Sequence, residues 1–301
     1  MKLSRLLKAT ERSLKITAIR AAVRIGSQLA PQRTAEFVAR RFFVTDKRAA
    51  PRAADCSGPV SEKLQAPDGQ IATYRWGDVQ RSPTVVLVHG WNGRAQQMEH
   101  FAAPLRQLGF AVLAFDHIGH GASSGDRSSL PVIIRTVDHV LKGVPDPAGV
   151  IAHSIGGAAV ASVLASSRSK LSAAVLIAPP SDPRPFLMNL ARMLGAPETL
   201  LLSIQQAAER MAGVEFKRLV ADPWNVRRIR TPLFVIHDVG DEEVPISNGY
   251  AYTLDSRTRL LATDGLGHRR ILRDLHVVEE ATKFIALRQP VPGEQRTLIA
   301  A

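Results

Sequence analysis

The chain has 301 residues, 45% of them hydrophobic and 22% charged, a composition typical of a globular protein with one large domain and appendages. Residues 1–50 hold twelve lysines and arginines against three acidic residues, so a net +9 of the formal charge of +12 lies in this segment. No apolar run reaches the roughly 20 residues of a membrane span, and cationic residues interrupt every candidate core of a secretory signal. The single cysteine, Cys56, excludes an internal disulfide, and we interpret it as a free thiol in a linker of a cytoplasmic protein.

The N-terminal segment predicts an arm of two helices. Residues 3–29 place apolar side chains at helical spacing opposite a basic face, and Pro31 ends this helix or starts the next, which includes Phe42 and Phe43. Two interpretations stay open. In the first, residues 1–30 lie on the anionic surface of the inner face of the membrane. In the second, the arm docks on the body and the basic face of the arm is in solvent. Nucleic-acid binding is disfavoured, because the arm has no recognisable module with interleaved aromatic residues.

After the arm, predicted strands and helices alternate, which favours a doubly wound, mainly parallel α/β sheet with right-handed crossovers. The turn Pro67-Asp68-Gly69 joins the first two strands as a hairpin. The predicted strands are residues 63–66, 70–76, 84–89, 111–115, 149–152, 173–177, 233–237 and 257–262. The predicted helices are residues 94–108, 132–141, 158–165 and 270–287.

Residues 179–230 interrupt this alternation, since they open with four prolines and contain no good strand. Two helices are predicted there, over 186–194 and 198–211, and we interpret them as a short cap over the carboxyl ends of the strands, where ligand sites of α/β sheets form. The predicted organisation is an arm (1–45), a linker (46–59), a first core part (60–180), the cap (181–230), a second core part (231–290) and a tail (291–301).

One stretch carries the strongest functional signal. The apolar strand at 149–152 runs into Ser154, and a helix of small residues follows directly. The chain must reverse within two or three residues, so the positions two before and two after the serine need small side chains, and Ala152 and Gly156 supply them. This is the G-x-S-x-G pattern of a nucleophile elbow with alanine in its first position. The alternative is a serine that only caps the helix.

A serine hydroxyl is a poor nucleophile at neutral pH, so it needs a general base, and that base needs an orienting acid. In an elbow architecture these follow the serine in the order acid, then histidine. Asp241 lies just after the strand at 233–237, and His268 lies just after the last predicted strand. Three neighbouring acids compete with Asp241 for the orienting role: Asp238, Glu242 and Glu243.

Five motifs in sequence order make the chain resemble an α/β-hydrolase, over roughly residues 60–287. Within that superfamily it is most similar to bacterial lysophospholipase-like and serine-aminopeptidase-like (S33-type) hydrolases. The motifs are Val88-His89-Gly90-Trp91, Phe115-Asp116-His117-Ile118-Gly119-His120-Gly121-Ala122-Ser123, the elbow His153-Ser154-Ile155-Gly156-Gly157, Asp241-x-x-Val244-Pro245 and Gly267-His268.

The resemblance implies an α/β-hydrolase fold with a helical cap and a serine hydrolase that cleaves small-molecule carboxylic esters without a cofactor. Ser154 would be the nucleophile, His268 the general base, and Asp241 the orienting acid, because only Asp241 lies three residues before Val244-Pro245. The backbone N–H groups of Trp91 and Ile155 would form the oxyanion hole.

Several alternatives stay open beside this reading. A peptidase, a thioesterase or an acyltransferase would use the same fold, and a non-catalytic membrane-associated binding protein belongs to another class. Asp116 is expected to bond backbone within its loop, and the histidines of the motif loops, including His89 and His153, are expected to fix loop geometry. The spacing of His117 and His120 could suggest a metal pair, but no carboxylate or cysteine ligand lies nearby in sequence, so no metal is predicted.

Overall fold

The structure, a computed structural model, describes residues 2–46, 59–166, 171–254 and 258–288, with side chains from residue 16 onward. Cys56, most of the predicted linker at 46–59 and the predicted tail at 291–301 lie outside these residues. The domain boundaries therefore stay a prediction.

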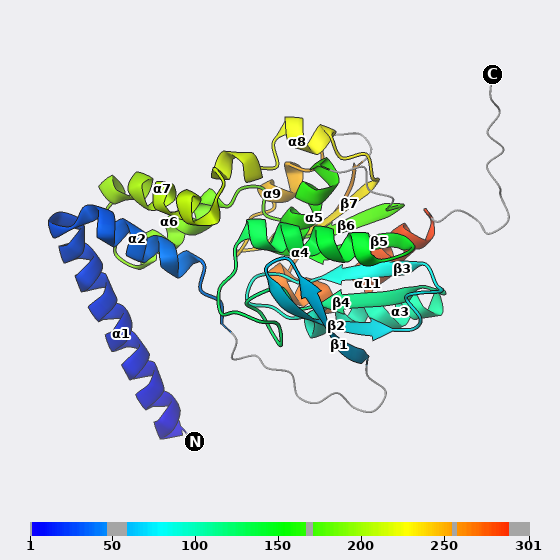
Figure 1. The fold of residues 1–301 in the computed structure, drawn as a ribbon, viewed down its shortest axis with the longest axis horizontal. Helices are drawn as coiled ribbons and strands as arrows, with labels where there is room; N and C mark the ends of the chain where they lie inside the picture. The colour runs from blue at the N-terminus through cyan, green and yellow to red at the C-terminus, as the bar shows by residue number, and fades with distance from the viewer. Residues whose placement is uncertain (1, 47–58, 167–170, 255–257, 289–301) are drawn as a thin grey trace.

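The core is one eight-stranded sheet in the order β1-β2-β4-β3-β5-β6-β7-β8 (Figure 1). Among the described strands, β1 with β2 and β2 with β4 pair antiparallel and the other five neighbouring pairs are parallel, which confirms the predicted mainly parallel sheet. The strands are β1 (Val60–Ala66), β2 (Gly69–Trp76), β3 (Thr84–Val88), β4 (Ala111–Phe115), β5 (Pro147–His153), β6 (Ala173–Ile177), β7 (Leu233–Asp238) and β8 (Thr258–Thr263).

Helices cover both faces of this sheet, because its interior strands are apolar on both sides. In β3, for example, Val86 and Val88 point to one helical layer and Val85 and Leu87 to the other. The first layer contains α4 (Leu130–Gly143), α5 (Ile155–Ser166) and α8 (Pro223–Arg227). The second contains η1 (Ala95–Phe101), α3 (Ala102–Gln107), η4 (Ile271–Arg273) and α11 (Leu275–Ala286), while α9 (Ser247–Tyr250) and α10 (Gly267–Arg270) are single turns.

Two predicted helices are broken in the structure. The segment 94–108 is a 3-10 helix followed by an α-helix, and Ala95, Met98 and Phe101 are all buried at a spacing of three, which suits the tighter 3-10 turn. The segment 270–287 is interrupted by Asp274, whose side chain accepts the Val277 N–H at 3.0 Å. An N-cap aspartate starts a new helix at this point.

The second helix of the N-terminal arm packs on the cap, while the first helix extends away from it (Figure 1). Helix α1 (Lys2–Leu29) ends before Pro31, which opens α2 (Pro31–Phe42). Helix α2 packs on the two cap helices α6 (Arg184–Met193) and α7 (Leu201–Ala212), which are joined through η2 (Glu198–Leu200) and followed by η3 (Phe216–Leu219). A third apolar cluster forms between them, and it also takes in the buried Val23 of α1. The described residues of 179–230 form no strand, as predicted.

Candidate active site

The elbow has the sharp geometry that its small residues predict. Ser154 lies between β5 and α5 with φ +53°, a left-handed backbone conformation that residues other than glycine rarely adopt. Its N–H donates to the Ile177 carbonyl at 2.8 Å, which fixes the turn to the neighbouring strand. A Cβ at Gly156 would lie 2.5 Å from the His89 oxygen, so this position must be glycine. Ala152 is fully buried, and its methyl group fits in the first position of the motif.

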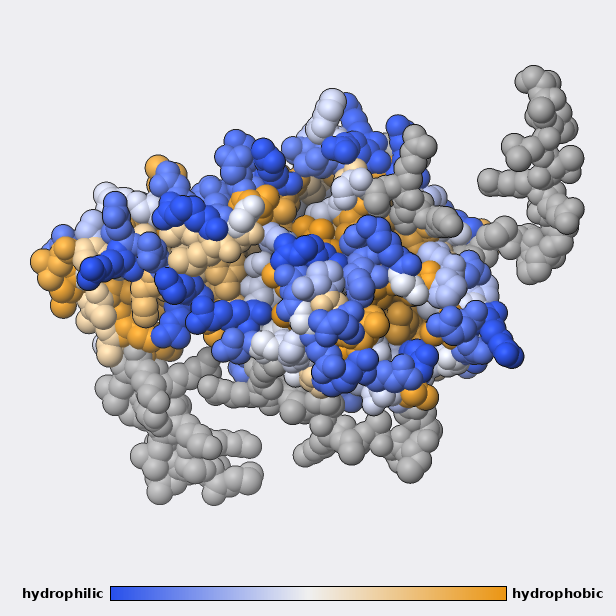
Figure 2. Space-filling view, viewed as in Figure 1, coloured by the Kyte–Doolittle hydropathy of each residue, from blue (hydrophilic) through white to orange (hydrophobic). Residues whose placement is uncertain are grey.

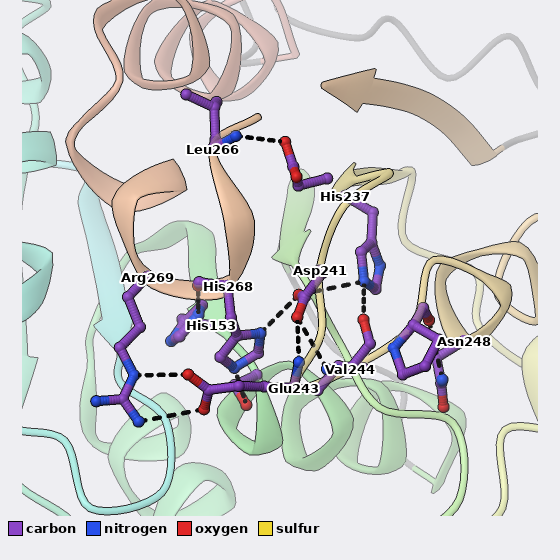
Figure 3. A network of polar contacts seen from close by, with 12 residues as sticks. His153, His237, Asp241, Glu243, Val244, Asn248, Leu266, His268 and Arg269 are labelled. Carbon is purple, nitrogen blue, oxygen red and sulfur yellow. Dashed lines mark hydrogen bonds and ion pairs between the residues drawn. The ribbon is translucent and has the colours of Figure 1, made fainter. Parts of the chain in front are cut away.

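The structure brings together the three predicted side chains. His268 Nε2 lies 3.0 Å from Ser154 Oγ. On the other side of the ring, His268 Nδ1 lies 2.7 Å from Asp241 Oδ2 (Figure 3). Since a carboxylate only accepts hydrogen bonds, Nδ1 carries the proton and Nε2 is free to accept the serine proton. All three side chains are buried, and the loops that follow β5, β7 and β8 place them at the same edge of the sheet.

Asp241 is held as a carboxylate that faces His268. Its Oδ1 accepts the N–H groups of Glu243 and Val244, each at 2.9 Å, and His237 Nε2 lies 3.6 Å from Oδ2 (Figure 3). Burial raises the pKa of Asp241, but the His237 and His268 imidazoles and the Val244 N–H outweigh it and hold the pKa below its usual range. The carboxyl is therefore ionised at neutral pH.

Asp238, one of the competing acids, has a different set of partners. Its carboxylate accepts the Thr263 hydroxyl at 2.8 Å, the Leu266 N–H at 2.9 Å and the Gly240 N–H at 3.1 Å. Burial raises the pKa of Asp238, but these donors and the Gly267 N–H lower it below its usual range. Asp238 thus ties β7 to the loop that leads into His268, without touching the imidazole.

His153, which directly precedes Ser154, holds the backbone of His268 in place. Its Nε2–H donates to the His268 carbonyl at 2.9 Å, and the centroids of the two imidazole rings lie 4.7 Å apart (Figure 3). Burial, and then the neighbouring His268, lower the pKa of His153 to about 3, so this imidazole is neutral. Its bond to the His268 carbonyl fixes loop geometry, which is the role expected of the motif histidines.

The loop after β4 is held by a bond within the loop and by bonds to η1 and to the end of β3. Asp116 accepts the N–H groups of Ala95 at 2.7 Å and Ala122 at 2.9 Å, the backbone role expected of it. His117 Nε2–H donates to the His89 carbonyl at 2.9 Å, while His89 Nε2 accepts the His117 N–H at 3.0 Å. Within the described residues, no group of three His, Cys, Asp or Glu side chains is arranged to hold a metal ion.

The two predicted oxyanion donors flank the serine. Ile155 is the first residue of α5, so its N–H is one of those that no carbonyl within the helix accepts. Trp91 lies in a tight turn that is closed by the Gly93 N–H to Gly90 carbonyl bond at 3.1 Å. Both residues line the cavity above Ser154, and both backbone N–H groups stay predicted donors.

A cavity of about 1090 Å³ lies above the serine, between the sheet edge and the cap. That volume is slightly above the range of about 300–1,000 Å³ that is typical of small-molecule sites. The core lines it with Trp91, His153, Ser154, Ile155 and His268, and the cap with Leu190, Met193, Phe216 and Leu219. The arm lines it with Arg41, Phe42, Phe43 and Val44.

These arm residues were missed by sequence reasoning. The one available signal was a pair of phenylalanines, Phe42 and Phe43, at the end of an amphipathic helix and just before a linker. That signal does not distinguish an aromatic pair that docks a helix from one that lines a cavity.

The fold and the elbow define an α/β-hydrolase. The family model described as Serine aminopeptidase, S33, matches residues 80–240, more than half of the chain, and the chain belongs to this family. Mouse monoglyceride lipase is 34% identical over 122 residues, which cover 37% of this chain and 40% of the lipase. A human serine hydrolase-like protein is 33% identical over 106 residues, covering 33% of this chain and 51% of that protein. The matched region thus spans about half or less of these relatives' own lengths.

Solved structures agree on the fold. An esterase from Pyrococcus furiosus, Pf2001, superposes with a TM-score of 0.59 at 19% identity and covers 82% of this chain and 100% of that one. A thioesterase domain from the curacin biosynthetic pathway superposes with a TM-score of 0.57 at 15% identity, covering 77% of this chain and 100% of that domain. At these identities the likeness concerns the α/β-hydrolase fold alone.

Proposed function

We propose that this chain is a serine hydrolase that cleaves carboxylic esters through a covalent acyl-enzyme. The observation that carries the proposal is the buried chain of contacts from Ser154 Oγ through His268 to the Asp241 carboxylate, at the floor of a large cavity. A non-catalytic binding protein would have no chemical need for such a chain. The matching relatives named as monoglyceride lipases support an ester as the substrate.

In the proposed reaction, Ser154 Oγ attacks the ester carbonyl carbon while its proton passes to His268 Nε2. Asp241 stabilises the imidazolium that forms, and the N–H groups of Trp91 and Ile155 stabilise the oxyanion. The intermediate collapses, the C–O bond to the alcohol breaks, and His268 returns the proton to the leaving alcohol. Water, activated by the same imidazole, then hydrolyses the acyl-enzyme and releases the carboxylic acid.

A peptidase, a thioesterase or an acyltransferase would share the first step, because each forms an acyl-serine. They differ in the leaving group and in the second acceptor. Turnover of matched esters, thioesters and aminoacyl amides, with and without an added alcohol, distinguishes these activities from ester hydrolysis.

The test of the proposed function is covalent labelling of Ser154 by a fluorophosphonate probe in the folded protein. We expect stoichiometric labelling that is mapped to Ser154 by peptide mass spectrometry and is abolished in Ser154→Ala. Ser162→Ala is the matched control, since Ser162 lies on α5 and bonds the Ala158 carbonyl at 2.9 Å. Folded wild-type protein that takes up no probe, or labelling that persists in Ser154→Ala, would refute the proposal.

We also propose that residues 1–30 contact the anionic surface on the cytoplasmic side of a membrane. In the part of α1 whose side chains are described, Ile25 and Leu29 are exposed and the helix carries Arg20 and Arg24. Figure 2 shows apolar surface at the end of the molecule where α1, α2 and α7 meet. Among the described residues, none of the helices is long and apolar enough to cross a bilayer.

Deletion of residues 1–30 should reduce sedimentation of the protein with anionic vesicles, and added salt should weaken the wild-type interaction. Neutral vesicles serve as the reference. Equal sedimentation of the full chain and the deletion variant on anionic vesicles would count against the membrane contact.

A further inference from the structure

We propose that the N-terminal arm forms a wall of the substrate cavity and sets the size of the apolar group that the enzyme accepts. Phe43, with Phe42 behind it, is the specificity-determining element of this wall. The inference rests on the proposed hydrolase function and adds to it a substrate class, an ester that carries an extended apolar group.

The first argument is that the end of the arm is fastened to the core beside Ser154. The Phe43 carbonyl accepts the Ser128 N–H at 2.9 Å, and the Thr45 N–H donates to the Asp126 carbonyl at 3.1 Å. The buried Thr45 hydroxyl also donates to the Gly119 carbonyl. Residues 43–45 are thereby held against the loop that follows β4, so the position of the two phenylalanines is fixed by backbone contacts.

The fastening continues next to a predicted oxyanion donor. The Asp46 N–H donates to Asn92 Oδ1 at 2.9 Å, and Asn92 directly follows Trp91. A shift of the arm would therefore displace Asn92 and with it the turn that carries the Trp91 N–H. This proximity places the arm at the reacting end of the cavity.

The second argument is that the other side of α2 is fastened to the cap. Val38 and Ala39 are fully buried in the same apolar cluster as Ile204 of α7 and Leu187 of α6. The arm therefore bridges the core loop and the cap, and the cavity lies in the space that this bridge closes.

An aromatic row spans the bridge. The Phe43 and Phe42 ring centroids lie 5.5 Å apart, and those of Phe42 and Phe216 lie 6.3 Å apart. All three residues line the cavity, and both arm rings are only half-buried, so part of each ring is available to a ligand. The row offers an apolar substrate group a continuous surface made jointly by the arm and the cap.

The expected energetics follow from burial of apolar surface. Each methylene group that the wall removes from water should raise kcat/KM about fourfold, up to the chain length at which the cavity is filled. A smaller side chain in the wall should reduce the rise of kcat/KM per methylene group. A larger side chain should make kcat/KM stop rising at a shorter substrate chain length.

The test is kcat/KM across two substrate series: p-nitrophenyl esters from acetate to dodecanoate, and acetates of alcohols of the same lengths. The series in which the wild-type rate rises with length identifies whether the acyl or the alcohol group meets the wall. In that series, Phe43→Ala should lower the ratio of long-chain to short-chain kcat/KM by about tenfold.

Two further variants keep the test sharp. Val44→Trp adds bulk at a side chain that is 39% exposed, and it should shift the preferred length to shorter esters. Phe37→Ala is the matched control, because Phe37 lies on α2 just before the wall and does not line the cavity; its ring centroid lies 5.2 Å from the Arg41 guanidinium carbon. It should leave the length profile of the wild type unchanged.

The failure of this inference is distinguishable from failure of the proposed function. Wild-type length profiles in both Phe43→Ala and Val44→Trp, with fluorophosphonate labelling retained, would overturn the role of the arm and leave the hydrolase proposal standing. A wild-type protein that neither takes up the probe nor turns over any ester would overturn both.

Discussion

Asp241→Asn should lower kcat for a preferred ester by about 10⁴-fold while the protein stays folded. The carboxylate accepts the His268 Nδ1–H at 2.7 Å, and this bond leaves Nε2 unprotonated toward Ser154. An asparagine side chain of the same shape can turn its NH₂ group to His268, which stabilises the tautomer that carries its proton on Nε2. That tautomer cannot accept the serine proton, and no negative charge remains to stabilise the imidazolium.

Asp238→Asn provides the contrast, because Asp238 is equally buried and lies three residues away. Its carboxylate accepts hydrogen bonds from Thr263, Leu266 and Gly240, and the Gly267 N–H also stabilises it. None of these donors is His268. We expect a loss of about 1–3 kcal/mol of unfolding free energy but a decrease in kcat of less than tenfold. The measurements are steady-state kinetics and urea unfolding of both variants; a larger kcat loss in Asp238→Asn than in Asp241→Asn would identify Asp238 as the orienting acid.

The sheet and the elbow were predictable because their signals are local. A run such as 84–88 is apolar and β-branched on both faces, which suits only an interior strand. At the elbow, steric crowding restricts Gly156 directly, so the motif itself encodes the backbone conformation. Local caps were predictable in principle as well; Asp274 is an N-cap that the helical periodicity of 270–287 obscured.

The orienting acid was harder to predict, since four acids lie within the six residues 238–243, which begin with the last residue of β7. The motif favours Asp241, but the contact depends on where the turn directs each carboxylate. In the structure the N–H groups of Glu243 and Val244 hold Asp241 toward His268, and the loop before His268 engages Asp238 instead. These backbone directions are set by tertiary contacts that periodicity does not encode.

The arm shows where sequence reasoning ends. An amphipathic helix with a basic face is compatible with a membrane, with a partner or with the body of its own chain. Its docking depends on the complementarity of Val38 and Ala39 to Ile204, which lies more than 160 residues further along the chain. The participation of Phe43 in the cavity depends in turn on the hydrogen bonds of Thr45, whose partners lie in a loop of no regular structure.

Acidification from pH 7.5 to pH 5.5 should lower the free energy of unfolding by about 4 kcal/mol. Three of the buried histidines, His89, His117 and His153, are neutral imidazoles at neutral pH. Burial, and then the charge of neighbouring imidazoles, hold the pKa of His89 well below its usual range and lower the pKa of both His117 and His153 to about 3. In the unfolded chain their pKa is about 6.5, so below that pH the unfolded state binds three protons that the native state does not.

The sign follows from this difference in bound protons: stability falls with falling pH between about 6.5 and 3, by about 1.4 kcal/mol per pH unit for each histidine. Asp238 and Asp241, whose pKa values are lowered, act only below this experiment's range, since the stability they bring is present above a pKa near 4 and is lost as the pH falls further. Urea unfolding at constant ionic strength measures the change. His117→Gln should reduce the pH slope by about one third. Equal unfolding free energies of the wild type at pH 7.5 and pH 5.5 would show that the native state takes up these protons after all.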